Sequence, residues 1–224
     1  DSRTFVLVLL CVWQISSIPI DVQQNDFPTF LEDTVAAPIT SKMKGTTYLG
    51  FGSDYNTTQS QQSLENVVKS GVEWIAVITD WIQDSINTTQ IYRTSATVPD
   101  DVLISFIQYA KSMGLKILLK PHVDVSAADS ENWRGQIGTY FTDDQWNVWF
   151  ASYNSMILHY ASIASKYQLD IFCVGTELSE TSKQEKHWRN TISKVRSAYA
   201  GNLVYAANWG WELETIRYWD ALDI

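Results

Sequence analysis

The sequence is poor in cysteine and histidine, the residues that build disulfide frameworks and most zinc sites. It contains only two cysteines, Cys11 and Cys173, and only three histidines, His122, His159 and His187. Cys11 lies in an apolar segment near the N-terminus and Cys173 within an apolar run, so we expect no disulfide and interpret Cys173 as a small core residue. Because neither a CxxC pair nor a histidine cluster is present, we expect no metal and no other cofactor.

Positive charge is also scarce. The 224 residues carry 16 lysines and arginines against 25 acidic residues, a net charge of −9 and a pI near 4.7. Such a chain repels phosphates, so we expect no nucleic-acid partner, whereas a neutral polysaccharide is compatible with the charge. A hydrophobic content of 45% supports one globular domain, and ten tryptophans supply rings that can fill a core or stack on sugars.

Long apolar runs are absent as well. The run at residues 5–13 follows Arg3, is too short to span a bilayer and fits the apolar region of a signal peptide. We therefore interpret residues 1–20 as a signal peptide or apolar N-terminal segment and residues 21–42 as an irregular lead-in. Asn56 and Asn87 each begin an Asn-Thr-Thr sequon. We predict a glycosylated monomer, secreted or held in the endomembrane lumen, with no stable membrane span.

From residue 43 onward, strand-like and helix-like segments alternate. Strands are expected at 46–51, 72–79, 115–120, 171–176 and 203–208, and residues 222–224 begin another. Helices are expected at 60–70, 99–113, 142–167 and 213–219, and one more follows a cap at 181–184. This alternation predicts an α/β fold with a parallel sheet and right-handed crossovers. Without a glycine-rich dinucleotide fingerprint, we favour an incomplete (β/α)8 TIM barrel over a doubly wound sheet, with residues 43–224 supplying strands 1 to 5 and the start of 6.

The helix at 142–167 has the clearest pattern. Thr142 and Gln145 form a capping box at its start. Apolar and aromatic residues then recur at helical spacing, and we expect this stripe to face the core rather than a ligand: Trp146, Trp149, Phe150, Tyr153, Met156, Ile157, Tyr160, Ile163, Ala164 and Tyr167.

Glu177 is the strongest candidate for chemistry. It directly follows the expected strand 171–176, which is apolar on both faces and therefore reads as a buried parallel strand. The C-terminal ends of such strands hold the active sites of (β/α)8 barrels. A carboxylic acid partly withdrawn from water holds its proton, as cleavage of a glycosidic bond requires. The competing interpretation is a carboxylate that caps the following turn or pairs with a lysine.

Polar and aromatic residues also follow the other expected strands, at the same edge of the sheet. Together they suit the hydroxyls and ring faces of sugars. Each has an ordinary alternative: an ion pair between Lys120 and Asp124, a structural hydrogen bond at His122, and loop packing for the two tryptophans. The candidate sugar-binding residues are Trp81, Lys120, His122, Asp124, Asn208 and Trp209.

Several short motifs resemble glycoside hydrolase family 113. They are MKG at 43–45, KPHVDV at 120–125, NWRG at 132–135, WFASY at 149–153, FCVGTEL at 172–178, HWR at 187–189, YAANW at 205–209 and WDALD at 219–223. The resemblance implies a retaining β-mannan hydrolase on a clan A barrel, with Glu177 as general acid/base and Thr176 before it, where most of the clan has asparagine. It adds Trp133 and Arg134 to the candidate sugar contacts. The family's nucleophile, a glutamate after the seventh strand, would lie beyond residue 224.

The retaining mechanism needs a second carboxylate about 5–5.5 Å from the acid. Asp124 is the best candidate within the chain, although it looks more like a substrate contact, and Glu212 and Glu214 are expected to be solvated. We therefore expect these 224 residues to be inactive alone. Two alternatives stay open: a non-catalytic carbohydrate-binding barrel, and a clan A hydrolase that acts on glucan or xylan.

Overall fold

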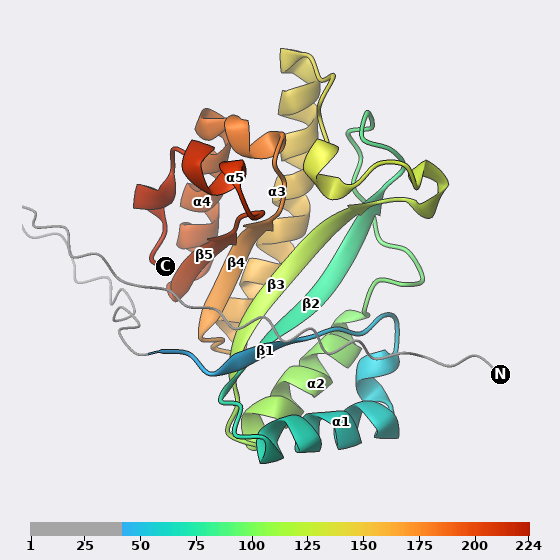
Figure 1. Ribbon diagram of the computed structural model, residues 1–224, viewed down its shortest axis with the longest axis vertical. Helices are drawn as coiled ribbons and strands as arrows, with labels where there is room; N and C mark the ends of the chain where they lie inside the picture. The colour runs from blue at the N-terminus through green and yellow to red at the C-terminus, as the bar shows by residue number, and fades with distance from the viewer. Residues whose placement is uncertain (1–41) are drawn as a thin grey trace, which may run out of the picture.

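Five parallel strands form one sheet in the sequential order β1-β2-β3-β4-β5 (Figure 1). The structure is a computed structural model that describes residues 42–224. The predicted signal segment at 1–20, Cys11 and the lead-in up to residue 41 lie outside the described residues. The strands are β1 (Gly45–Tyr48), β2 (Trp74–Gln83), β3 (Lys116–Val125), β4 (Ile171–Thr176) and β5 (Asn202–Ala206). The helices are α1 (Thr58–Lys69), α2 (Asp100–Ser112), α3 (Asp143–Lys166), α4 (Glu185–Ala198) and α5 (Trp211–Thr215).

Each of the first four strands is followed by a helix that returns the chain to the start of the next strand. This connection places every strand parallel to its neighbour and is the repeating unit of a (β/α)8 barrel. The predicted α/β fold with a partial barrel is therefore confirmed. In the described part of the chain, no helix is both long and apolar enough to cross a membrane.

Strand β4 is the most deeply buried element of the sheet. All six of its residues are buried, as expected for a parallel strand covered on both faces. The thiol of Cys173 is buried and donates a hydrogen bond to the Gly175 carbonyl oxygen at 3.1 Å, which agrees with its predicted role as a core residue.

The two strands β2 and β3 extend further than their apolar runs predicted. They pair over ten positions, from Trp74 opposite Lys116 to Gln83 opposite Val125. Polar residues at the end of β2 can remain in the strand because Gln83 is satisfied there. Its amide nitrogen donates to the carbonyl oxygen of Ser85, and its side-chain oxygen accepts from the Trp149 indole. The predicted end of this strand at residue 79 was thus too early by four residues.

Helix α3 matches its prediction. The Thr142 hydroxyl accepts from the Gln145 backbone N–H at 3.3 Å, and the Gln145 side chain accepts from the Thr142 N–H at 3.0 Å. Its aromatic stripe is buried against the sheet and α4, apart from Tyr167 at the end, which is only partly buried.

Three predictions for the last third of the chain were wrong. Thr181 does not cap a helix: it opens a separate 3-10 turn, Thr181–Lys183, its hydroxyl donates to the Leu178 carbonyl oxygen, and α4 begins only at Glu185. The expected helix at 213–219 is shorter and earlier, and a second 3-10 turn, Trp219–Ala221, follows it. Residues 222–224 form no strand, although the Asp223 N–H donates to the Leu203 carbonyl oxygen.

Candidate active site

Three candidate residues meet at the end of β3, where Arg134 holds the other two, His122 and Asp124. The Arg134 guanidinium donates from Nε and Nη2 to the two Asp124 carboxylate oxygens, both at 2.8 Å. Its Nη1 lies 2.6 Å from His122 Nδ1. The ion pair at Asp124 is therefore formed with Arg134 rather than with the predicted alternative, Lys120.

His122 is held as a neutral imidazole, and its second ring nitrogen can donate a hydrogen bond. Because arginine can only donate, Nδ1 must accept, which leaves the proton on Nε2. Burial, followed by the positive charges of Arg134 and Lys120, keeps the pKa of His122 well below its usual range. The buried Nε2 has no hydrogen-bond partner among residues 42–224.

Asp80 also belongs to this cluster. It pairs in register with His122, so both side chains lie on the same face of the sheet. Burial, and next the negative charge of Asp124, raises the pKa of Asp80 from its ordinary value to about 6. Its Oδ1 is buried without a partner in the described part of the chain. The period-two alternation of β2 is a signal that would have identified Asp80 as a site residue.

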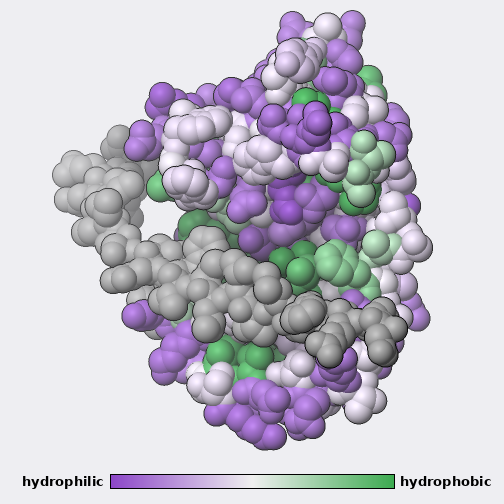
Figure 2. Space-filling view, turned by 45° about the vertical axis from the view of Figure 1, so that its right-hand side comes forward, coloured by the Kyte–Doolittle hydropathy of each residue, from purple (hydrophilic) through white to green (hydrophobic). Residues whose placement is uncertain are grey.

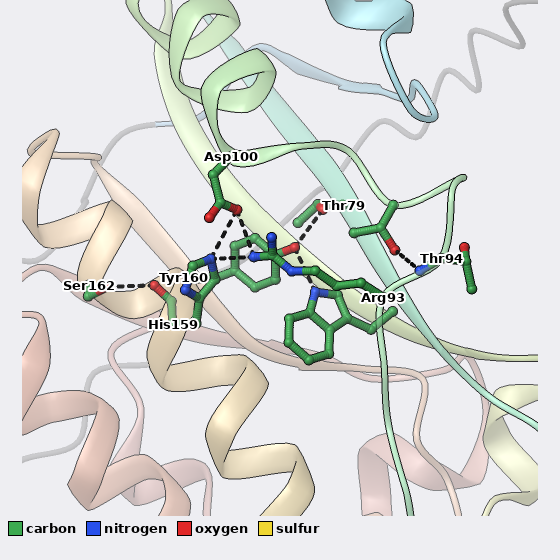
Figure 3. A network of polar contacts seen from close by, with 9 residues as sticks. Thr79, Arg93, Thr94, Asp100, His159, Tyr160 and Ser162 are labelled. Atoms are coloured by element: carbon green, nitrogen blue, oxygen red, sulfur yellow. Dashed lines mark hydrogen bonds and ion pairs between the residues drawn. The ribbon is translucent and has the colours of Figure 1, made fainter.

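The same alternation turns Trp81 away from this cluster. Its indole nitrogen donates to the Tyr160 hydroxyl at 2.8 Å, and the Arg93 guanidinium lies 5.1 Å from the ring centre. Figure 3 shows the surrounding network, in which Tyr160 also bonds Thr79 and in which Arg93 and His159 meet Asp100. The structure thus places Trp81 in packing between β2 and α3 and does not bring it to the other candidates.

Glu177 leaves the sheet at the end of β4 in an uncommon conformation. Its φ is +54°, in the left-handed region that non-glycine residues rarely adopt. Its backbone N–H donates to the Ala206 carbonyl oxygen of β5 at 2.8 Å. Unlike the buried strand before it, Glu177 is partly exposed, and within residues 42–224 its carboxylate makes no hydrogen bond or ion pair. Among these residues, no contact therefore supports either alternative for Glu177, a cap of the following turn or an ion pair with a lysine.

The loop after β5 presents Trp209 to solvent, with 91% of the residue exposed. This exposure argues against the packing alternative for Trp209. The neighbouring Asn208 is partly buried, and its backbone N–H donates to Glu212 Oε2 at 2.5 Å.

Glu212 is not solvated as predicted, because only 1% of it is exposed. Its Oε1 accepts from the Tyr205 hydroxyl at 2.8 Å, and its Oε2 also accepts from the Ser179 hydroxyl at 3.3 Å. Glu214, two residues later, is exposed as expected. No periodic pattern predicts this difference, because α5 has only five residues.

Trp133 and Arg134 lie in the long connection between β3 and α3. The Trp133 ring covers Gly135 so closely that a β-carbon there would lie 2.2 Å from the ring. The Gly135 carbonyl oxygen accepts from the Glu180 N–H at 2.9 Å, which ties this connection to the loop after β4. Trp133 remains 43% exposed and is therefore available to a ligand.

One face of the molecule carries a polar region beside apolar surface (Figure 2). Figure 2 shows hydrophilic residues gathered in a recess at the middle of the face it presents, next to a patch of apolar residues. Across residues 42–224, no three His, Cys, Asp or Glu side chains gather closely enough to hold a metal ion.

Comparison with known families identifies the chain. The model of Glycoside Hydrolase Family 113 matches residues 46–224. The chain belongs to glycoside hydrolase family 113. This confirms the resemblance that the motifs indicated, and the family's solved structures confirm the TIM-barrel fold class.

Two solved family 113 structures illustrate the similarity. One is described as a complex structure of GH113 beta-1,4-mannanase, with 33% identity and a TM-score of 0.75. It is matched over 81% of this chain and 60% of its own. The other is GH113 beta-mannanase AaManA from Alicyclobacillus acidocaldarius in complex with ManMIm, with 31% identity and a TM-score of 0.73, over 81% and 59% of the two chains. The present chain thus spans about 60% of the length of these relatives. A comparison with curated protein sequences finds no significant match.

Proposed function

We propose that this family 113 chain provides the acid/base half of a retaining glycoside hydrolase that acts on β-1,4-mannan. The observation that carries the proposal is Glu177, a partly exposed carboxylate that lies at the end of a buried barrel strand and has no hydrogen-bond or ion-pair partner among residues 42–224. The substrate follows from the two solved relatives, which are described as beta-mannanases.

In this mechanism Glu177 acts twice. It first protonates the glycosidic oxygen while a second carboxylate attacks the anomeric carbon, so that the leaving sugar departs as an alcohol. Glu177, now ionised, then removes a proton from water, which attacks the glycosyl-enzyme and restores both carboxyl groups.

We propose that the nucleophile lies outside these 224 residues, because Asp124 and Glu212, the two carboxylates weighed for that role, are engaged elsewhere. Both oxygens of Asp124 accept hydrogen bonds from Arg134. Glu212 is buried, and both of its oxygens accept hydrogen bonds from protein groups. Asp124 is thus held in a two-point ion pair and Glu212 is closed off from solvent, so neither carboxylate is placed to attack a sugar.

The polar cluster and the exposed rings would bind the sugar. Among residues 42–224 the His122 Nε2–H has no acceptor and the Asp80 Oδ1 has no donor, so each could bind a sugar hydroxyl. Trp209 and Trp133 offer exposed ring faces. Arg134 orients His122 and Asp124. Lys120 and Asn208, at the ends of the same sheet, complete this set of proposed contacts.

We also propose that the protein enters the secretory pathway. Asn56 and Asn87 are both exposed, so an oligosaccharide could be attached to either without disturbing the core. Peptide mapping of protein from its native host, before and after enzymatic deglycosylation, tests this proposal. Unmodified asparagines at both positions would contradict it.

The decisive test of the function is Glu177→Gln in a protein that contains the complete barrel. We expect hydrolysis of β-1,4-mannan oligosaccharides to fall by about 10²- to 10⁴-fold with little loss of binding, because only the proton donor is removed. Product formation by chromatography and oligosaccharide affinity by calorimetry measure the two effects.

The matched control is Glu180→Gln, a change of another carboxylate in the same loop, whose partner is Lys183. It should leave turnover unchanged. Equal turnover in the wild type and Glu177→Gln would exclude the proposed acid. Binding without any hydrolysis by the wild type would support the carbohydrate-binding barrel, and a preference for xylan or cellulose oligosaccharides would change the substrate.

A further inference from the structure

Glu212 is a buried carboxylate that the proposed mechanism does not use. We propose that Glu212 is a positioning residue, which fixes the loop that carries Glu177 relative to the loop that carries Asn208 and Trp209. The inference rests on the proposed function, since it assigns Glu212 a role through the acid/base residue.

The contacts of Glu212 join the two loops directly. In the loop after β4, the Ser179 hydroxyl donates to Glu212 Oε2 at 3.3 Å, and the Leu178 N–H donates to the Tyr205 hydroxyl at 3.2 Å. The Tyr205 hydroxyl in turn donates a hydrogen bond to Glu212 Oε1 at 2.8 Å. In the loop after β5, the Asn208 N–H donates to Oε2 at 2.5 Å.

The protonation of this network follows from its burial. Burial raises the pKa of Tyr205 well above its usual range. The neighbouring Tyr218 and Glu212 raise it further, because they disfavour a negative charge on Tyr205. Tyr205 therefore keeps its proton and donates it toward the carboxylate. A buried carboxylate is costly unless hydrogen bonds satisfy it, and three donors converge on Glu212. An uncharged side chain would leave some of these donors without an acceptor.

The geometry around Glu177 explains why this network matters for chemistry. The backbone of Glu177 has a positive φ and is fixed by Ala206 on one side. The next two residues, Leu178 and Ser179, are fixed by the Tyr205–Glu212 pair on the other side. A proton donor must be held to within about 0.5 Å of its productive position. Glu212 supplies part of that restraint without touching the substrate.

The test is Glu212→Gln in a protein with the complete barrel. The amide keeps the volume but replaces one acceptor oxygen with a donor, so either the Asn208 N–H or the Tyr205 hydroxyl then faces another donor. We expect kcat/KM on mannan oligosaccharides to fall by about 10- to 100-fold, as misplacement of a catalytic group does. The matched control, Glu214→Gln on the exposed side of the same helix, should have no effect.

A second substrate separates positioning of the acid from general damage. A 2,4-dinitrophenyl β-mannobioside has a leaving group that departs without protonation. Its kcat/KM, which reports formation of the glycosyl-enzyme, should therefore fall by less than about threefold in Glu212→Gln. Equal losses on both substrates, or no loss on either, would overturn the inference.

Two further variants complete the design. If Glu212→Gln does not fold, Tyr205→Phe removes only the hydroxyl that links Leu178 to Glu212, and the same selective loss is expected at smaller size. Glu177→Gln is measured in parallel. Wild-type turnover in that variant would refute the proposed function, whereas its inactivity beside a fully active Glu212→Gln would refute only the role of Glu212.

Discussion

At the residue scale, Asp80 and His122 give the polar cluster an unusual response to pH. Asp80 has a folded-state pKa of about 6, above its ordinary value of 3.8, so the folded protein holds this proton between these values while the unfolded chain has lost it. Its contribution to stability is therefore present at low pH and is lost as pH rises through about 6.

His122 acts in the opposite direction. The pKa of His122 in the folded protein is well below 6.5. Below pH 6.5 the imidazole therefore binds a proton in the unfolded chain but not in the folded protein. Its contribution to stability is therefore lost as pH falls below about 6.5. Because the two effects oppose each other, a difference between variants reveals each one better than the pH profile of the wild type.

We predict that Asp80→Asn removes the first effect. Asparagine fits the same volume and carries no charge, so the variant should gain stability relative to the wild type at pH 7.5, on the order of 2 kcal/mol. The gain should shrink toward pH 4, where Asp80 is already protonated. Denaturant unfolding at the two pH values measures it, and Asp84→Asn, an exposed carboxylate near the end of the same strand, serves as the control. A gain that is equal at both pH values would contradict the assigned cause.

At the scale of the elements, the start of α3 is set by its capping box. We predict that Thr142→Ala lowers the free energy of unfolding by about 1 kcal/mol, because the Gln145 N–H loses its acceptor. Ser155→Ala on the exposed side of the same helix removes only a bond to the Ala151 carbonyl and should be near neutral. Chemical denaturation of both variants gives the comparison, and equal effects would mean that the cap is not specific.

The elements with strong local patterns were predictable from the sequence. The cap and stripe of α3, the apolar run of β4 and the alternation of strands and helices all follow from spacing along the chain. The end of β2 was not predictable from its apolar run, because Gln83 stays in the strand only through contacts with Ser85 and Trp149. Those contacts depend on the packing of α3 against the sheet.

The candidate site was predicted less completely than the fold. The register of β2 and β3 brings Asp80 beside His122, and the connection after β3 returns Arg134 to His122 and Asp124. Trp81 and Glu212 differed from expectation for two reasons. Side-chain alternation within β2 turns Trp81 away from the polar cluster and toward Tyr160. A hydrogen bond from the Asn208 N–H closes the loop after β5 around Glu212 and buries its carboxylate.

At the scale of the whole molecule, the proposed polysaccharide site includes exposed rings on the loops that follow the strands. We predict that Trp209→Ala weakens oligosaccharide binding by about tenfold, or about 1.4 kcal/mol, and leaves the melting temperature unchanged because the ring is almost fully exposed. Tyr140→Ala, another exposed ring in the connection between β3 and α3, tests whether the effect is specific to the β5 loop. A drop in melting temperature without a change in affinity would assign Trp209 to packing.

The backbone of Glu177 also bears on how this sequence has been selected. Among residues 42–224, only Gln168 and Glu177 are non-glycine residues with a positive φ. Gln168 follows the C-terminal residue of a helix, where this conformation is common, but Glu177 follows a strand. Glycine or asparagine at 177 would relieve roughly 1 kcal/mol of strain, so the glutamate stands there at a cost to stability. Folding alone does not explain its presence, and strained residues of this kind cluster at functional sites.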